Sequence, residues 1–254
     1  MLRAVIGFVV PVVVVYVGLC VALFMFQRSF IYFPPRGPAG VPSELLQLSV
    51  PGAELKVAVR ALEGPNALVY FGGNGEDVSF NLPAFSSAFP DHALYLLNYR
   101  GYGGSTGSPT EEAIQQDALA LFDAIHAKHP KVVVMGRSLG SGVAIRLASQ
   151  RPARRLVLIT PYASIAELGA RQFPYFPVRW LLRDRYESWR YAPKITVPTL
   201  LVAAERDGII PRSSTEELYA YFKTGIASLK IIPGVGHNDI SQSPGYLEAL
   251  KAVP

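Results

Sequence analysis

Six continuous apolar runs, with turns or helical patterns between them, constrain most strongly what this chain can fold into. They are ALVYF (67–71), ALYLLNY (93–99), KVVVMG (131–136), RRLVLIT (154–160), PTLLVAA (198–204) and SLKIIP (228–233). Runs without polar alternation are typical of strands that are buried on both faces, as in a parallel sheet. Strands that alternate with helices indicate an α/β sheet covered on both faces.

Two shorter runs precede these six and alternate in part, LLQLSV (45–50) and ELKVAVRA (54–61), with Pro51-Gly52 between them. This arrangement predicts an antiparallel hairpin at the start of the sheet. We therefore expect a mostly parallel eight-stranded sheet with an N-terminal antiparallel hairpin and helices on both faces. The helical patterns are TEEAIQQDALALFDAIHAKH (110–129), with Thr110 as N-cap, SSTEELYAYFK (213–223) and PGYLEALKAV (244–253).

One segment, at about 161–195, interrupts the alternation and is rich in Phe, Tyr, Trp, Pro and Arg. We interpret it as a small cap-like excursion from a single α/β domain that covers 46–254. Its aromatic residues could form a cover over a site and accept an acyl chain. The alternative is that they only complete the core.

The N-terminus reads AVIGFVVPVVVVYVGLCVALFMF (4–26) and contains no charged residue. About 20 apolar residues span the hydrocarbon core of a bilayer, so we predict a single-pass transmembrane signal anchor over 1–28 and a juxtamembrane linker over 29–45. A cleaved signal peptide has a shorter apolar stretch and a small-x-small cleavage site, and this segment offers no such site. A buried core helix would show an amphipathic period, which is absent here. The side of the membrane stays open, because Arg3 precedes the run while Arg28 and Arg36 follow it.

Composition and spacing exclude several classes of function. The net charge is +5, but the basic residues are scattered, so we expect no nucleic-acid partner. Cys20 is the only cysteine, which excludes an intramolecular disulfide and a thiolate metal site. No His, Asp or Glu cluster has the spacing of metal ligands, and we predict neither a metal nor a cofactor. RGYGGSTGSP (100–109) lacks the endings of a phosphate-binding or dinucleotide-binding loop and indicates a tight connection after a strand.

The segment GRSLG (136–140) matches G-x-S-x-G and lies between an apolar run and a helical pattern. In that context Ser138 would stand on a sharp strand-to-helix turn, where side chains at Gly136 and Gly140 would collide with neighbouring elements. The simpler interpretation is that Ser138 caps a helix and that the glycines only make a turn.

A nucleophilic serine in such a fold needs an acid and then a histidine after later strands. His237 is the only histidine after Ser138; we expect His126 and His129 to be solvated near the exposed end of a helix. Asp207 follows the 198–204 run and is our candidate acid, with Glu205 and Asp239 as competitors.

Acyl chemistry also needs donors for the developing oxyanion. The backbone N–H of Leu139, directly after the serine, is one candidate. The second is the backbone N–H of Asn74 in the loop GGNGED (72–77), where the glycines allow a close approach of the backbone. An ordinary turn is the alternative for this loop.

The chain resembles the α/β-hydrolase superfamily, and more narrowly its membrane-anchored bud-emergence-homologue branch, which includes lysophospholipases and protein depalmitoylases. The motifs that carry the resemblance are the apolar N-terminus before IYFP, then FGGNGED, LNYRGYGGSTGSPTE, GRSLGSGVA, LLRDRYES, PTLLVAAERDGIIP and IPGVGHND. The resemblance implies Ser138 as nucleophile, Asp207 as acid, His237 as base, and Asn74 with Leu139 as the oxyanion hole. Gly72 stands where the family has a histidine, so we expect the oxyanion loop to lack a side chain that stiffens it.

These features together predict a membrane-anchored serine hydrolase that cleaves carboxylic esters or thioesters, with lipid or acylated molecules as possible substrates, through an acyl-enzyme. An amidase, a peptidase or an acyltransferase would use the same three residues. A non-catalytic membrane-bound scaffold with this fold is the alternative from another class.

Overall fold

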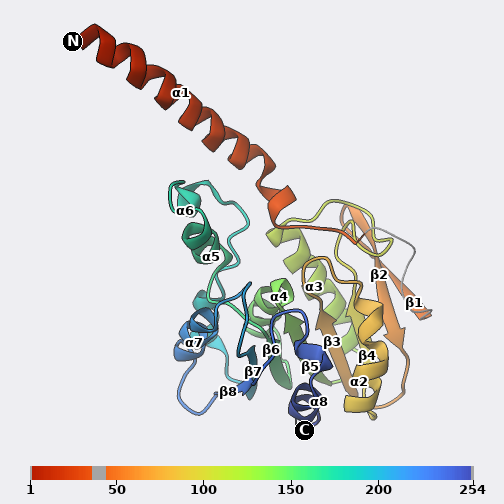
Figure 1. The fold of residues 1–254 in the computed structure, drawn as a ribbon. Helices are drawn as coiled ribbons and strands as arrows, with labels where there is room; N and C mark the ends of the chain where they lie inside the picture. The colour runs from red at the N-terminus through yellow and green to blue at the C-terminus, as the bar shows by residue number, and fades with distance from the viewer. Residues whose placement is uncertain (1, 36–43, 253–254) are drawn as a thin grey trace.

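The computed structural model describes residues 2–35 and 44–252, so residues 36–43 of the predicted linker lie outside the described residues. Eight strands form one sheet in the order β1-β2-β4-β3-β5-β6-β7-β8 (Figure 1). The strands are β1 (Glu44–Val50), β2 (Ala53–Arg60), β3 (Asn66–Phe71), β4 (Ala93–Leu97), β5 (Lys131–Arg137), β6 (Arg155–Ile159), β7 (Thr199–Ala204) and β8 (Ala227–Ile232). All eight overlap the runs that the sequence predicts as strands.

The sheet is antiparallel only at its N-terminal edge. β1 pairs with β2 around a tight turn that brings Val50 opposite Ala53. β2 also pairs antiparallel with β4, and every later pair of neighbours is parallel. The predicted hairpin and the mostly parallel sheet are confirmed.

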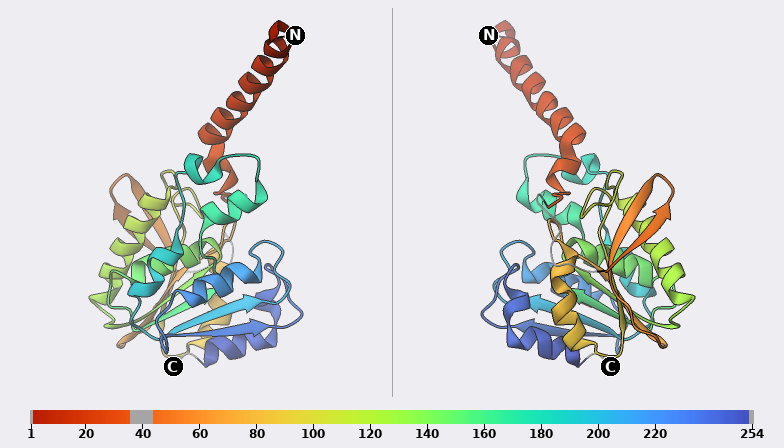
Figure 2. Two further views of the ribbon diagram at one scale, coloured as in Figure 1. Left: turned by 90° about the vertical axis from the view of Figure 1, so that its left-hand side faces the viewer. Right: turned by 90° about the vertical axis from the view of Figure 1, so that its right-hand side faces the viewer.

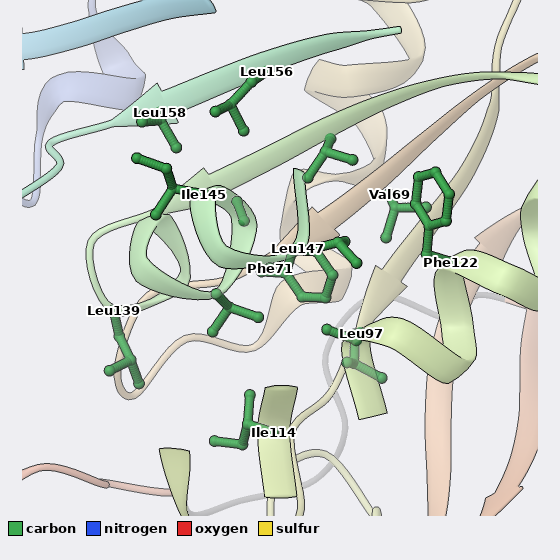
Figure 3. Close-up of a cluster of buried hydrophobic side chains, with 14 of the residues drawn as sticks. Val69, Phe71, Leu97, Ile114, Phe122, Leu139, Ile145, Leu147, Leu156 and Leu158 are labelled. Atoms are coloured by element: carbon green, nitrogen blue, oxygen red, sulfur yellow. The ribbon is translucent and has the colours of Figure 1, made fainter. Parts of the chain in front are cut away.

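Helices cover both faces of the sheet. One face carries α3 (Glu111–His126), α4 (Leu139–Ala148) and α7 (Arg212–Ala220), and the other carries α2 (Leu82–Ala88) and α8 (Pro244–Lys251). Successive residues of β3 belong to opposite faces, since Val69 packs in the cluster of α3 and α4 while Tyr70 packs in the cluster of α2 and α8. Figure 3 shows side chains of the first of these clusters, among them Ile145 and Leu147 of α4 and Val69 and Phe71 of β3. Burial on both faces explains the absence of alternation in these strands.

The first turn of α3 follows its sequence signals. The side chain of Thr110 accepts a hydrogen bond from the backbone N–H of Ala113 at 3.1 Å, as expected of an N-cap. His129, just beyond this helix, is buried, with Nε2 3.1 Å from the Tyr95 hydroxyl and Nδ1 2.7 Å from the Gly64 carbonyl. The expectation that His129 is solvated was wrong, because its ring packs against Tyr95 of β4 and the connection between β2 and β3 that contains Gly64.

The N-terminal helix α1 (Leu2–Phe26) projects away from the rest of the molecule (Figure 1) and leads into a 3-10 turn, η1 (Gln27–Phe30). The candidate span Ile6–Phe30 contains an 18-residue stretch with a mean hydropathy of 2.8, and none of this stretch is buried. It is therefore no core helix. By length and composition it can cross a membrane.

The segment 161–195 contains α5 (Ile165–Gln172), α6 (Val178–Leu181), η3 (Ser188–Arg190) and η4 (Ala192–Lys194). In both views of Figure 2, α5 and α6 lie beside the base of α1. Tyr175 and Trp180 are 85% and 89% exposed. For these two residues, the alternative that they complete the core is wrong.

Two further 3-10 turns lie outside this segment, η2 (Val78–Asn81) and η5 (Ile240–Gln242).

Candidate active site

Ser138 lies between the end of β5 and the start of α4, in a strained backbone conformation. Its φ of 49° is in the left-handed region, which side chains other than glycine rarely adopt. Its N–H donates to the Ile159 carbonyl at 2.9 Å. A β-carbon at Gly136 would collide with the Gly140 carbonyl, and one at Gly140 would collide with the Phe71 carbonyl. The predicted steric need for both glycines is confirmed, because α4 begins in direct contact with β3 and β5.

The structure brings the side chains of Ser138, His237 and Asp207 into one chain of hydrogen bonds. His237 Nε2 is 2.9 Å from Ser138 Oγ, and His237 Nδ1 is 2.8 Å from Asp207 Oδ2. The His237 and Asp207 side chains are only 7% and 3% exposed. The other carboxylate oxygen of Asp207 accepts from the N–H groups of Ile209 and Ile210 at 2.9 and 2.7 Å. Asp207 is thus held in the orientation that presents Oδ2 to the imidazole.

The two competing carboxylates lie elsewhere. Glu205 accepts a hydrogen bond from the Gly234 N–H at 2.8 Å, and Asp239 accepts one from the Gly236 N–H at 2.7 Å. Both contacts are on the loop that leads to His237, so these residues shape the loop, whereas Asp207 contacts the imidazole itself.

The loop after β3 lies against the serine. A β-carbon at Gly73 would be 3.5 Å from the Ser138 β-carbon. The side-chain oxygen of Asn74 accepts from the Phe33 N–H at 2.8 Å and from the Tyr102 hydroxyl at 2.9 Å, which fixes the position of the residue. The Gly73 N–H donates to Glu76 at 2.6 Å and is therefore engaged. The backbone N–H groups of Asn74 and Leu139 remain the candidate donors to an oxyanion.

Glu76 holds this loop in place, although position 72 carries a glycine and so has no side chain to do so. Its carboxylate accepts four hydrogen bonds, from the Gly73 N–H, the Tyr70 hydroxyl, the Asn81 amide and the Arg137 guanidinium. A β-carbon at Gly72 would lie 2.7 Å from Val78 Cγ1, so this chain has no room for a larger residue there. The loop therefore lacks the side chain that the family has at position 72, as expected, but it is held by Glu76.

Arg137, directly before the serine, joins the two loops of the site. It donates from one terminal nitrogen to Glu76 Oε2 and from the other to the His237 carbonyl, each at 3.1 Å. Its side chain is 16% exposed and that of Glu76 is 10% exposed. Burial is the largest single effect on the guanidinium and lowers its pKa, but the charge and hydrogen bond of Glu76, together with Tyr70 and Tyr246, outweigh burial, and the pKa is raised overall. The sequence carries no local signal for this role, because the partners are 61 and 100 residues away.

This arrangement contains the groups that acyl transfer requires. They are a hydroxyl hydrogen-bonded to an imidazole, a carboxylate that orients the imidazole, and two backbone N–H groups nearby. Within 2–35 and 44–252, no group of three or more His, Cys, Asp or Glu side chains is placed to hold a metal ion.

Comparisons with known proteins find related sequences over most of the chain. The family model described as Serine aminopeptidase, S33, matches residues 84–191, which include Ser138. Rv2307c, an uncharacterized protein of Mycobacterium tuberculosis, is 34% identical over 90% of this chain and 88% of its own length. Protein bem46 of Schizosaccharomyces pombe is 27% identical over 90% of this chain and 85% of its own length. Lysophosphatidylserine lipase ABHD12 of Macaca fascicularis is 31% identical over 75% of this chain and 56% of its own length.

Solved structures share the fold. Est1E of Butyrivibrio proteoclasticus, in a structure with ferulic acid, superposes with a TM-score of 0.68 at 17% identity, over 82% of this chain and 96% of that one. The monoacylglycerol lipase of Paleococcus ferrophilus gives a TM-score of 0.60 at 20% identity, over 78% and 95%.

Proposed function

Because the chain belongs to the α/β-hydrolase superfamily, in the branch of bem46 and ABHD12, we propose that it is a membrane-anchored serine hydrolase of carboxylic esters or thioesters. The observation that carries the proposal is the buried chain of hydrogen bonds from Ser138 Oγ through His237 to Asp207, at 2.9 and 2.8 Å. The lipase relative supports a substrate with an acyl ester.

In the proposed reaction, Ser138 Oγ attacks the carbonyl carbon while His237 Nε2 takes the hydroxyl proton. Asp207 holds the imidazole and stabilises the positive charge that forms on it. The N–H groups of Leu139 and Asn74 stabilise the oxyanion of the tetrahedral intermediate. The intermediate collapses to the acyl-enzyme, and His237 gives its proton to the departing alcohol or thiol. Water, deprotonated by the same imidazole, then releases the acid and restores the serine.

Cleavage of an amide is a second candidate, favoured by the description of the family model as a serine aminopeptidase. The same three residues would act, and only the leaving group and its pocket would differ. Parallel assays with matched ester, thioester and amide substrates separate the two, and formation of a new ester with an added alcohol would identify an acyltransferase.

The nucleophile can be tested with a fluorophosphonate probe, which reacts with activated serines. We expect the full-length protein to be labelled and Ser138→Ala to remain unlabelled. Ser149→Ala, which alters a serine at the far end of the same helix, is the control and should label normally. Equal labelling of Ser138→Ala and the unmodified protein would contradict the assignment, and no labelling of either would favour the non-catalytic scaffold.

We also propose that α1 anchors the protein as a single-pass membrane helix. Its 25 residues and the absence of buried residues in its most apolar stretch support this, because such a surface is unfavourable in water and favourable in hydrocarbon.

A further inference from the structure

An apolar cavity of about 220 Å³ lies where the base of α1 meets the 161–195 segment. Leu23, Phe30 and Ile31 line it from the N-terminal side, and Leu168, Phe173 and Val178 line it from the other side. Part of the predicted anchor thus forms one wall of a cavity in the folded domain.

The wall offers nothing to a polar ligand. Gln27 is the only polar side chain among the residues that line the cavity. Its amide nitrogen donates to the carbonyls of Phe24 and Leu181 at 2.8 and 3.1 Å, and its amide oxygen accepts from the Arg183 N–H at 2.6 Å. Because these groups are already bonded, an occupant gains only from burial of hydrocarbon. The volume is also smaller than the roughly 300–1,000 Å³ of pockets for drug-sized ligands, which suits a single linear chain.

The two walls are fixed to one another above and below the cavity. The Tyr16 ring stacks on Phe176 with centroids 5.9 Å apart, and the Tyr16 hydroxyl donates to the Tyr175 carbonyl at 2.9 Å. At the base, Arg28 bonds the carboxylate of Asp184 at 3.0 Å.

These contacts also set the depth of the segment. Tyr16 lies ten residues before Phe26, which corresponds to about 15 Å along a helix. When α1 spans a bilayer, the tip of the 161–195 segment therefore lies among the lipids. Its exposed side chains Tyr175 and Trp180 then contact the lipids.

The chain runs directly from the wall of the cavity to the candidate active site. Ile31 lines the cavity, and Phe33, two residues later, donates its N–H to Asn74 in the oxyanion loop at 2.8 Å. We propose that the cavity holds the acyl chain of a bilayer lipid whose ester or thioester carbonyl lies at Ser138, with the anchor helix as part of the acyl site. This inference rests on the proposed function and names its substrate class.

The test places an indole ring in the cavity. Full-length Leu168→Trp, in detergent micelles, is assayed with p-nitrophenyl palmitate and p-nitrophenyl butyrate, and the ratio of the two kcat/KM values is compared with that of the unmodified protein. We expect the ratio of palmitate to butyrate to fall by about tenfold or more, because the long chain loses its buried methylenes. Gln172→Trp adds the same ring at an exposed position of the same helix and should keep the original ratio.

An unchanged ratio in Leu168→Trp overturns the inference while leaving the hydrolase proposal intact. If Leu168→Trp no longer reacts with the fluorophosphonate probe, Val178→Phe fills the cavity from α6 and is judged by the same ratio. An unmodified protein that cleaves neither ester and is not labelled overturns the proposed function, and the inference with it.

Discussion

The position of the oxyanion loop depends on the carboxylate of Glu76. It holds the Gly73 N–H at 2.6 Å and so fixes the peptide directly before Asn74. Through Arg137 it is also linked to the carbonyl of His237. A single buried ion pair thus sets the distance between the loop that would bind the oxyanion and the loop that carries the imidazole.

We expect Glu76→Gln to lower kcat by about tenfold while KM changes little. The neutral amide loses the charge that holds Arg137, and its NH2 group cannot accept hydrogen bonds as the second carboxylate oxygen does. Loss of an entire oxyanion donor costs about 10²–10³ in kcat, and a displaced donor costs less. Steady-state kinetics on a p-nitrophenyl ester measure the effect, and Glu248→Gln on the exposed side of α8 is the control. A kcat equal to that of the unmodified protein would show that the loop keeps its geometry without the charge.

At the scale of elements, the first turn of α3 contains two neighbouring glutamates with opposite linkage to pH. Burial raises the pKa of Glu111, although the N–H groups of Tyr186 and Arg185 partly offset the shift. Hydrogen bonds from the side chains of Gln116 and Arg146 lower the pKa of Glu112. A raised pKa means that the contribution of Glu111 to stability is present at low pH and is lost as pH rises through its folded pKa. Glu112 contributes above its unfolded pKa and loses this contribution as pH falls.

Substitution of each residue by glutamine should therefore change the pH profile of stability in opposite directions. As the pH is raised from about 4 to about 7, the unmodified protein loses the contribution of Glu111 and the Glu111→Gln variant does not. The free energy of unfolding of the variant should therefore rise more, or fall less, over this range than that of the unmodified protein. Glu112→Gln should do the reverse at lower pH, from about pH 5 down to about pH 3, where the unmodified protein loses the contribution of this carboxylate. Urea unfolding at a series of pH values measures both, and parallel profiles for the two variants would contradict the assignment.

The contact between α1 and the 161–195 segment depends on Asp184, whose carboxylate is buried. It accepts from Arg28 at 3.0 Å and from the Tyr32 hydroxyl at 3.1 Å. Burial raises the pKa of the Tyr32 hydroxyl.

We expect Asp184→Asn to lower the free energy of unfolding by about 1–3 kcal/mol, since bonds to a charged group are replaced by weaker ones. Thermal or chemical unfolding in detergent measures it. The matched control is Glu217→Gln, which removes an exposed ion pair with Arg171 and should cost less than about 1 kcal/mol. Equal effects of the two variants would show that the contact at Asp184 contributes no more than a surface pair.

Periodicity and apolar runs predicted the elements well, because a strand that is buried on both faces is recognisable by a continuous apolar run in its own sequence. The order of the serine, acid and histidine along the chain was equally readable, and the structure brings all three side chains together. What could not be read were contacts between distant residues. His129 is buried by Tyr95 and Gly64, and nothing near it in the sequence indicates this. The contacts of Arg137 and the cavity at the base of α1 likewise join residues that are far apart in the sequence, so no local pattern predicts them.

At the scale of the whole molecule, the proposal of an uncleaved anchor makes a prediction about mass. Protein extracted from membranes by detergent should retain the residues of α1, and alkaline carbonate should leave it in the membrane pellet. Intact-mass spectrometry measures the first, since cleavage after the helix would remove about 3 kDa from the 27.6 kDa chain. A mature protein that begins after Phe26 would identify the segment as a cleaved signal peptide.

The short span from the apolar helix to the oxyanion loop has a kinetic consequence. Phe33, whose N–H donates to the Asn74 side chain, lies only seven residues after Phe26. With the helix in a bilayer, the site stays at the surface, so the proposed lipid substrate would reach it by lateral diffusion in two dimensions. Turnover will then follow the mole fraction of substrate among the surrounding lipids, and dilution of the membranes in buffer will leave it unchanged.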